Sequence, residues 1–303
     1  MRGTPYSLMR LSITGLVGVV LLVLLACSSP DDDQASGEIR VAVSLEIFAD
    51  MVRNVAGDHA DVRALLPSGA DTHTYELPPN RVARVARADI TFINGLGLEE
   101  ASEDVLRNSA SGPVIELADG LPVLDAGDED DQSGGNPHLW LNVQLAARYV
   151  ETIRDALIEL DPVGRADYQS NAKAYLDELA VLDEEFVVAV EAIPAENRKL
   201  VTFHDAYPYM AERYGLEVIA VVIRSPGQEP SAQAIADLVR DIEGLPAVFK
   251  EPQFNAEVLE LAAEDTGVQV LDLLSDAYVD GVDSYVELMR FNMNQLLEGL
   301  GGE

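Results

Sequence analysis

The chain has 303 residues, and 48% of them are apolar, which is enough to bury the core of one large domain or two modest ones. Its 53 acidic residues outnumber its 20 basic residues and give a formal net charge of −33 at pH 7. This charge argues against binding nucleic acid through phosphate neutralisation, and we expect most carboxylates to lie on a solvated face.

Residues 1–26 have the pattern of a secretory signal peptide. Two arginines precede an apolar run that extends to Ala26 and is too short to span a membrane comfortably. The run ends in Leu-Leu-Ala-Cys, which resembles a bacterial lipobox, and Cys27 is the only cysteine of the chain. We therefore predict an exported protein that is lipidated at Cys27 and anchored at the outer face of the cell membrane, in a periplasmic or extracellular location.

Residues 27–37 are rich in Ser, Asp and Gly and lack apolar periodicity, which predicts a flexible tether. From residue 38 onward, β-branched runs alternate with segments of helical apolar spacing. Strands that alternate with helices pair in parallel in a sheet covered on both faces, with functional loops at the carboxyl ends of the strands. Residues 38–163 are thus predicted to form an N-terminal α/β lobe.

Two helices follow one another in the middle of the chain. Residues 142–160 have helical periodicity and stop at an Asp-Pro pair, and a longer helix is predicted for residues 164–192. A helix of that length spans roughly 40 Å, enough to cross a domain. The acidic, glycine-rich segment 125–135 interrupts the alternation, and we expect a solvated insertion there rather than a metal-collecting loop.

The alternation of strands and helices resumes in residues 193–303, which are predicted to form a C-terminal α/β lobe. The predicted strands cover residues 198–204, 217–223, 247–252 and 268–274, and the last helix covers residues 284–297. The expected fold is therefore α/β, with two lobes that each hold a mostly parallel sheet flanked by helices and that are joined by one long helix.

Histidine is the commonest neutral protein ligand for zinc and related metals, and the chain has only four. His73 and His204 follow predicted strands and His138 lies at a loop-to-helix junction, so these three are expected where strand-end loops converge. His59 lies between a helix and a strand and is expected to be a surface residue. A single histidine is more often a hydrogen-bonded structural residue, and the spacing matches no short metal motif such as HExxH.

Six segments of the body carry a resemblance to a known family. They are PSGADTHTYEL at 67–77, ARADITFINGLGLE at 86–99, NPHLWLN at 136–142, TFHDAYPYMAERYGL at 202–216, SPGQEPSAQAIADLVRDI at 225–242 and VFKEPQFN at 248–255. Together they resemble the zinc- and manganese-binding solute-binding lipoproteins of bacterial metal ABC transporters, the ZnuA/TroA-like family of cluster A-I. The first segment departs from the family pattern at Thr72, where proline is usual.

The resemblance implies an extracytoplasmic protein that captures a divalent transition metal between two lobes joined by a rigid linking helix. It implies that His73 and His138 of the N-terminal lobe and His204 of the C-terminal lobe are metal ligands. The metal would be a transported ligand, delivered to the membrane permease of an ABC transporter. We expect a monomer that performs no reaction and is not an enzyme.

The fourth metal ligand is open between two aspartates, because relatives supply a carboxylate after the last strand. Asp276 is preferred over Asp272, since Leu-Ser-Asp-Ala around it resembles the manganese-type segment Tyr-Ser-Asp-Ala and since it lies beyond the strand. Glu251, at another strand end, is a further candidate, expected to support the ligands rather than to bind metal.

Three neutral imidazoles and one carboxylate suit tetrahedral zinc, and a histidine rather than a glutamate at position 204 favours zinc first. Manganese is second, because it prefers more oxygen donors. The chain lacks the long His-rich loop common in dedicated zinc binders of the family, which leaves a manganese or broad-specificity role open. Ligating imidazoles must be unprotonated, so we expect affinity to fall as pH drops through about 6.5.

Two other functions are alternatives. A metal-dependent hydrolase would need an open coordination position and a general base for bound water, whereas four protein ligands would close the site. A metal-binding surface adhesin is a role described for some relatives, but the sequence has no distinct adhesive module.

Overall fold

The computed structural model describes residues 3, 38–125, 134–223, 227 and 230–302 of the chain. The compact body begins at Glu38. The predicted signal peptide, Cys27, the tether and most of the acidic segment lie outside the described residues. Among the described helices, none has both the length and the apolar character needed to cross a membrane.

The first half of the body is built on a four-stranded parallel sheet with the strand order β2-β1-β3-β4. Its strands are β1 (Ile39–Val43), β2 (Ala60–Ala64), β3 (Ile90–Ile93) and β4 (Val114–Glu116). The helices α1 (Glu46–Ala56), α2 (Pro79–Val85) and α3 (Glu100–Ser109) follow the first three strands. Because helices cover both faces of the sheet, all four residues of the inner strand β3 are buried.

The second half repeats this topology with different residues. Its strands are β5 (Lys199–His204), β6 (Glu217–Ile223), β7 (Ala247–Lys250) and β8 (Gln269–Asp272), which pair in parallel in the order β6-β5-β7-β8. The helices are α6 (Pro208–Tyr214), α7 (Ala232–Ile242), α8 (Glu257–Thr266) and α9 (Tyr285–Leu300). In both sheets the strand order reverses beside the first strand, which is where parallel α/β sheets place their ligand sites.

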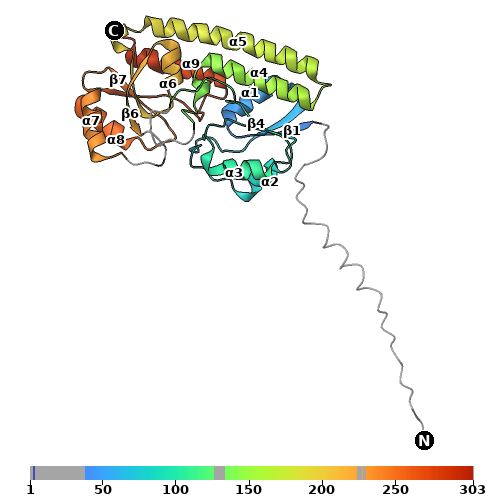
Figure 1. Ribbon diagram of the computed structural model, residues 1–303. Coiled ribbons are helices and arrows are strands. Elements are labelled where there is room, and N and C mark those ends of the chain that lie inside the picture. The colour runs from blue at the N-terminus through green and yellow to red at the C-terminus, as the bar shows by residue number, and fades with distance from the viewer. Residues whose placement is uncertain (1–2, 4–37, 126–133, 224–226, 228–229, 303) are drawn as a thin grey trace. The chain divides into compact units, whose positions relative to one another are not determined.

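Helix α5 (Arg165–Ala192) joins the two halves, and it runs alongside α4 (Val143–Leu160) and above α9 in Figure 1. Its buried residues recur at alternating spacings of three and four, which places one stripe of the helix against the body. They are Tyr168, Ala172, Tyr175, Leu179, Leu182, Asp183, Phe186 and Val190. At 1.5 Å per residue the 28 residues span about 42 Å, as expected for a linking helix.

One hydrophobic core runs through both halves, with members from β1, α1, α4, α5, β7 and α9. Trp140, in a short 3-10 helix (Leu139–Leu141), is fully buried and packs edge-on against Phe48 of α1 with 5.1 Å between ring centroids. Trp140 Nε1 also donates to the carbonyl of Ser275, and Tyr285 Oη of α9 donates to the carbonyl of Trp140. The two halves are therefore packed against each other, beyond their connection through α5.

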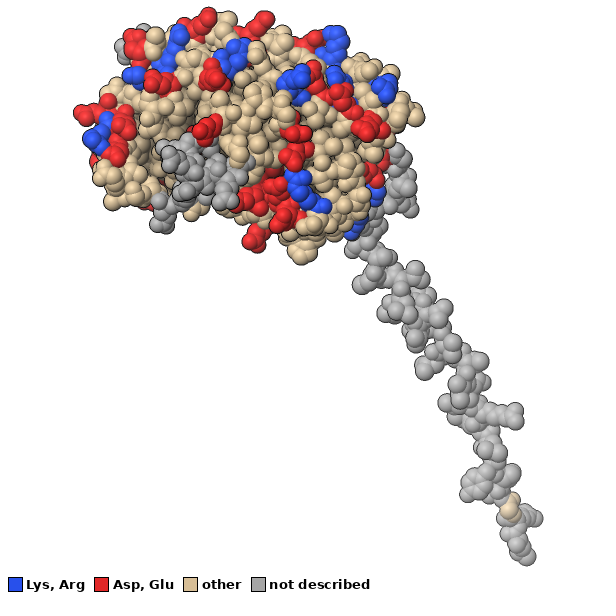
Figure 2. Space-filling model, in the orientation of Figure 1, with Lys and Arg blue, Asp and Glu red and all other residues tan. Residues whose placement is uncertain are grey.

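The predicted fold class and linking helix are confirmed, whereas helix α3 was not predicted. Only Ser102 and Leu106 of α3 are buried, so its sequence has too narrow an apolar stripe to be recognised. The predicted lobe boundaries at residues 163 and 193 stay predictions. Figure 2 shows acidic side chains scattered over both halves of one face, as expected of a solvated acidic surface.

The packing of α9 on the second sheet allows a test of this core. A Cβ added at Gly299 would lie 2.8 Å from Ala247 Cβ and 2.8 Å from Leu271 Cδ1. We expect Gly299→Val to lower the free energy of unfolding by about 1–3 kcal/mol through overpacking, measured by urea denaturation. Asn294→Ala, on the exposed face of α9, is the control and should change it by no more than about 0.5 kcal/mol. Equal stabilities would contradict the close packing.

Candidate metal centre

Three of the four histidines come together near the carboxyl ends of the strands of the two sheets. His73 lies in the loop after β2, His138 immediately precedes the 3-10 helix Leu139–Leu141, and His204 is the last residue of β5. Their potential ligand nitrogens all lie within 4.8 Å of one another. The ring centroids of His73 and His138 are 5.4 Å apart, and those of His138 and His204 are 4.8 Å apart. Residues far apart in sequence thus form a single cluster.

The Nε2 atoms of His73, His138 and His204 are buried, and none has a hydrogen-bond partner among the described residues. A buried polar atom without a partner carries a desolvation cost of about 1–3 kcal/mol, and such atoms are rare in folded proteins. Three such atoms on neighbouring rings form a group that could hold an electron-pair acceptor such as a metal ion. Imidazole nitrogens at this spacing fit a zinc-like ion with Zn–N bonds of about 2.0–2.1 Å after a small inward movement.

Asn136 determines which ring nitrogen of His138 can bind metal. Its Oδ1 accepts from the His138 backbone N–H at 3.1 Å and lies 3.0 Å from His138 Nδ1, while its Nδ2 donates to the Asp205 carbonyl. An amide oxygen only accepts, so Nδ1 must carry the proton and Nε2 is left with a lone pair. Ring orientation by such an outer hydrogen bond is typical of metal-binding histidines.

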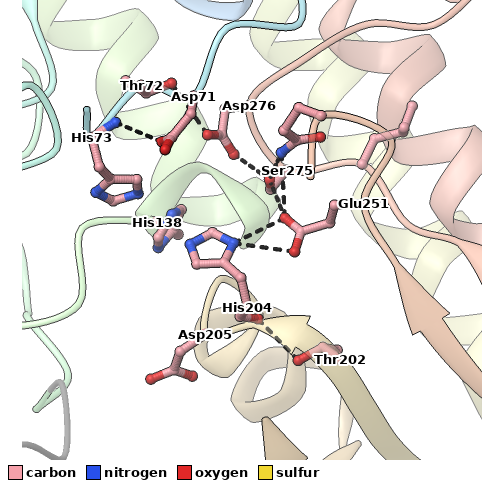
Figure 3. A network of polar contacts seen from close by, with 12 residues as sticks. Asp71, Thr72, His73, His138, Thr202, His204, Asp205, Glu251, Ser275 and Asp276 are labelled. Atoms are coloured by element: carbon pink, nitrogen blue, oxygen red, sulfur yellow. Dashed lines mark hydrogen bonds and ion pairs between the residues drawn. The ribbon is translucent and has the colours of Figure 1, made fainter. Parts of the chain in front are cut away.

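Glu251 plays the same part for His204. Both residues are 1% exposed, and His204 Nδ1 lies 3.0 Å from Glu251 Oε1 and 3.1 Å from Oε2. The carboxylate accepts the Nδ1 proton, so the Nε2 atom faces the other two histidines (Figure 3). Glu251 also accepts a 2.5 Å hydrogen bond from Ser275 Oγ. These contacts match the expectation that Glu251 supports a ligand.

His73 is the most accessible of the three, being half-buried where the other two are at most 2% exposed. Its backbone N–H donates to Asp71 Oδ1 at 3.1 Å, and Thr74 Oγ1 donates to Asp71 Oδ2 at 2.7 Å. Asp71 therefore closes a tight turn that holds the His73 backbone.

Asp276 is the aspartate that the structure places in this polar network. It is 6% exposed, Thr72 Oγ1 donates to its Oδ2 at 3.2 Å, and Ser275 Oγ hydrogen-bonds its Oδ1. Asp272 lies four residues earlier at the end of β8, where its backbone is in register with Lys250 of the neighbouring strand β7. The hydrogen-bonding neighbours of Asp276 favour it over Asp272.

Three supporting residues were not singled out from the sequence: Asn136, Ser275 and the hydroxyl of Thr72. Asn136 and Ser275 each lie within two residues of a candidate ligand, but the sequence does not reveal where their side chains point. Thr72 did carry a signal, because it departs from the usual proline. His59 lies apart from the cluster, with its Nε2 2.8 Å from Asp167 Oδ2 of α5.

The protonation states of the three histidines differ. Burial, assisted by the charge of His204, lowers the pKa of His73 to about 4, and burial lowers the pKa of His138 well below its ordinary value. Burial also opposes the charged form of His204, but the charge and hydrogen bond of Glu251 outweigh it and raise the pKa of His204 to about 9. At pH 7 His73 and His138 are neutral, while His204 holds a proton that a metal ion must displace.

Comparison of the sequence with known proteins identifies its family. The family described as zinc-uptake complex component A, periplasmic, matches residues 41–299. The manganese-binding lipoprotein MntA of Halalkalibacterium halodurans is 32% identical over 297 residues, which cover 94% of this chain and 97% of that protein. The chain belongs to the zinc-uptake component A family, as its motifs predicted.

Solved structures agree in fold. The periplasmic zinc-binding protein TroA from Treponema pallidum superposes with a TM-score of 0.80 at 27% identity, covering 88% of this chain and all of that chain. A Mn-bound periplasmic metal-binding protein from Candidatus Liberibacter asiaticus gives a TM-score of 0.77 at 26% identity, covering 87% of this chain and all of the other. The two-lobed α/β architecture is thus shared with metal-binding proteins.

The raised pKa of His204 makes a prediction about pH. Because binding must displace one proton below pH 9, affinity for Zn²⁺ should rise about tenfold per pH unit between pH 7 and pH 9 and then level off. Protons are therefore expected to compete with the metal ion already below pH 9, rather than only below about pH 6.5. Calorimetry in buffers of different protonation enthalpy should detect about one proton released per metal ion at pH 7.

Glu251→Gln tests the cause of this pH dependence. Removing the carboxylate removes the charge that raises the pKa of His204, so proton release at pH 7 should shrink and the affinity should vary less between pH 7 and pH 9. Glu257→Gln, an exposed substitution in the first turn of α8, is the matched control and should behave like the unaltered protein. An unchanged pH profile in Glu251→Gln would contradict the assignment.

Proposed function

We propose that this member of the zinc-uptake component A family is the extracytoplasmic substrate-binding protein of a metal ABC transporter. It captures a divalent transition metal with His73, His138, His204 and Asp276 and delivers the ion to a membrane permease. The observation that carries the proposal is the set of three buried Nε2 atoms, within 4.8 Å of one another and without hydrogen-bond partners among the described residues. The metal ion is the transported cargo, and the protein catalyses no reaction on it.

Zinc is the first cargo under this proposal and manganese the second. Three imidazole nitrogens and one carboxylate leave a divalent ion with a net charge of about +1, a donor set that suits four-coordinate zinc. Asp276 Oδ2 accepts a hydrogen bond from Thr72, and Asp276 Oδ1 contacts Ser275 Oγ. Rotation of the carboxylate into a bidentate mode would disturb these two contacts, which favours a single oxygen ligand. Manganese prefers more oxygen donors than this arrangement offers.

The ligands come from both lobes, if the lobes comprise residues 38–163 and 193–303 with the linking helix at 164–192. His73 and His138 then belong to the N-terminal lobe, and His204 and Asp276 to the C-terminal lobe. A bound ion would bridge the two lobes, and this bridging would signal to the permease that the protein is loaded with metal. Because the lobes share one core, we expect small shifts on binding rather than wide hinge closure. Lipidated Cys27 would hold this monomer at the outer face of the membrane, tethered through residues 27–37.

A metal-dependent hydrolase would need a free general base, a role considered for Glu251. The oxygens of Glu251 are occupied by His204 and Ser275. It is therefore placed to orient a ligand rather than to activate water. Metal content and hydrolase activity should be measured on the same purified sample. We expect about one ion per chain and no turnover of esters, peptides or phosphoesters; metal-dependent turnover would reject a pure binding role.

A pair of matched substitutions tests the ligand set. Asp276→Asn should weaken Zn²⁺ binding by more than the roughly 10- to 100-fold loss typical of outer contacts, because it weakens a direct ligand. Asp272→Asn, four residues away, should leave the affinity close to that of the unaltered protein. Competition with a chromogenic zinc chelator measures both. The opposite ranking would assign the fourth ligand to Asp272.

His204→Ala extends the same test to the histidines. Losing one of four bonds should again lower the Zn²⁺ affinity by more than 100-fold, as estimated above from outer contacts. His59→Ala is the control, because His59 contacts Asp167 on the surface and lies outside the cluster. Zinc affinity that survives in His204→Ala would sink the proposed site.

A further inference from the structure

Among the described residues, Asp183 is one of two buried carboxylates outside the metal centre, the other being Glu99. Asp183 lies in the linking helix α5 and is 7% exposed, at a position in the otherwise apolar stripe that faces the body. A buried carboxylate is destabilising unless it is paired and hydrogen-bonded. Its burial in this stripe therefore depends on the groups that form hydrogen bonds and ion pairs with it.

Those groups come from both halves of the protein. Gln144, in the first turn of α4, donates its Nε2 to Asp183 Oδ2 at 3.1 Å. Arg213, in α6, donates Nε to Oδ1 at 3.1 Å and Nη2 to Oδ2 at 2.5 Å. Tyr214 Oη donates to Oδ1 at 3.0 Å. A single side chain of the linking helix thus holds the start of α4 and the end of α6.

Helix α6 is fixed to the first half at both of its ends. At its end, the Tyr214 ring stacks on Phe186 of α5 with centroids 4.2 Å apart, and Tyr214 Oη is hydrogen-bonded by the backbone of Val143. At its start, Tyr209 Oη donates to the carbonyl of Asn136 at 2.7 Å and accepts from the backbone of Leu124. The helix therefore spans from the His138 loop to the linking helix.

These connections matter for the metal centre because the helices that make them are close in sequence to two candidate ligands. Helix α6 begins four residues after His204, and Gln144 follows His138 by six residues. His204 ends β5, whereas His138 lies outside the strands and precedes the 3-10 helix Leu139–Leu141, so no strand pairing fixes the distance between them. Asp183 contacts α4 and α6, the helices that follow His138 and His204 along the chain, and it does so from the helix that joins the two halves.

We propose that Asp183 is a positioning residue that sets the spacing of His138 and His204 and thereby tunes the affinity and geometry of the metal centre, without touching a ligand. The inference rests on the proposed metal-binding function. A purely structural carboxylate would support the stability of the fold and leave the metal centre of the folded protein unchanged. The two roles therefore predict different results.

The first test compares Asp183→Asn with Asp177→Asn in the mature chain. Asparagine keeps the shape of Asp183 but loses the charge that binds Arg213, so Zn²⁺ affinity should fall about tenfold or more, as for other outer contacts of metal ligands. The visible absorption bands of bound Co²⁺, which report ligand geometry, should shift or lose intensity. Asp177 lies on the same helix, is largely exposed and pairs with Lys173 on the surface, so its substitution should change neither property.

A milder pair of substitutions covers the case that Asp183→Asn fails to fold. Tyr214→Phe removes one hydroxyl that bonds Asp183, and Arg213→Lys keeps the positive charge but loses the two-pronged contact. Both should lower Zn²⁺ affinity, with Arg213→Lys keeping more of it than Arg213→Gln.

A double-mutant cycle tests whether the two halves act through the same carboxylate. Gln144→Leu and Arg213→Gln each remove a contact to Asp183 from a different lobe, so their combined loss in affinity should differ from the product of the single losses. Wild-type affinity and an unchanged Co²⁺ spectrum in every variant, even with lowered thermal stability, would overturn the inference. Failure of the unaltered protein to bind metal would instead reject the proposed function.

Discussion

Three imidazole nitrogens are held out of water at one point of the molecule, and they have no hydrogen-bond partners among the described residues. Such an arrangement is unfavourable by itself, since each buried nitrogen forgoes the hydrogen bond that water would supply. The surrounding fold must therefore hold His73, His138 and His204 in place against this cost. Three features hold the histidines in these positions. They are the topology of both sheets, the buried packing between the two halves and the polar groups around the rings.

The polar groups around the rings act through orientation and charge. Asn136 holds the proton of His138 on Nδ1, and Glu251 does the same for His204, so both rings present the nitrogen that can bind a metal. Glu251 also stabilises a proton on His204. The proposed site would thus exchange a proton for a metal ion at neutral pH, which links metal capture to the acidity of the surroundings.

The two halves of the protein are coupled through more than the linking helix. Trp140 and Tyr285 connect the His138 region to the segment around Ser275, and Asp183 connects α4 to α6. These contacts are buried and lie close to the candidate ligands. A protein built this way can signal metal binding through small adjustments of ligand loops, because the packed interface resists a large rotation of one half against the other.

The sequence by itself determined the alternating strands and helices, the long helix of residues 164–192 and the three histidines, because apolar periodicity and strand-end motifs are local properties. It did not reveal α3, whose buried stripe is too narrow, and it left Asp276 and Asp272 as alternatives. Only the tertiary structure brought Thr72 to Asp276, and Gln144 and Arg213 to Asp183. These contacts join residues from different sheets and helices, and their partners are set by how the two halves pack, which no local pattern encodes.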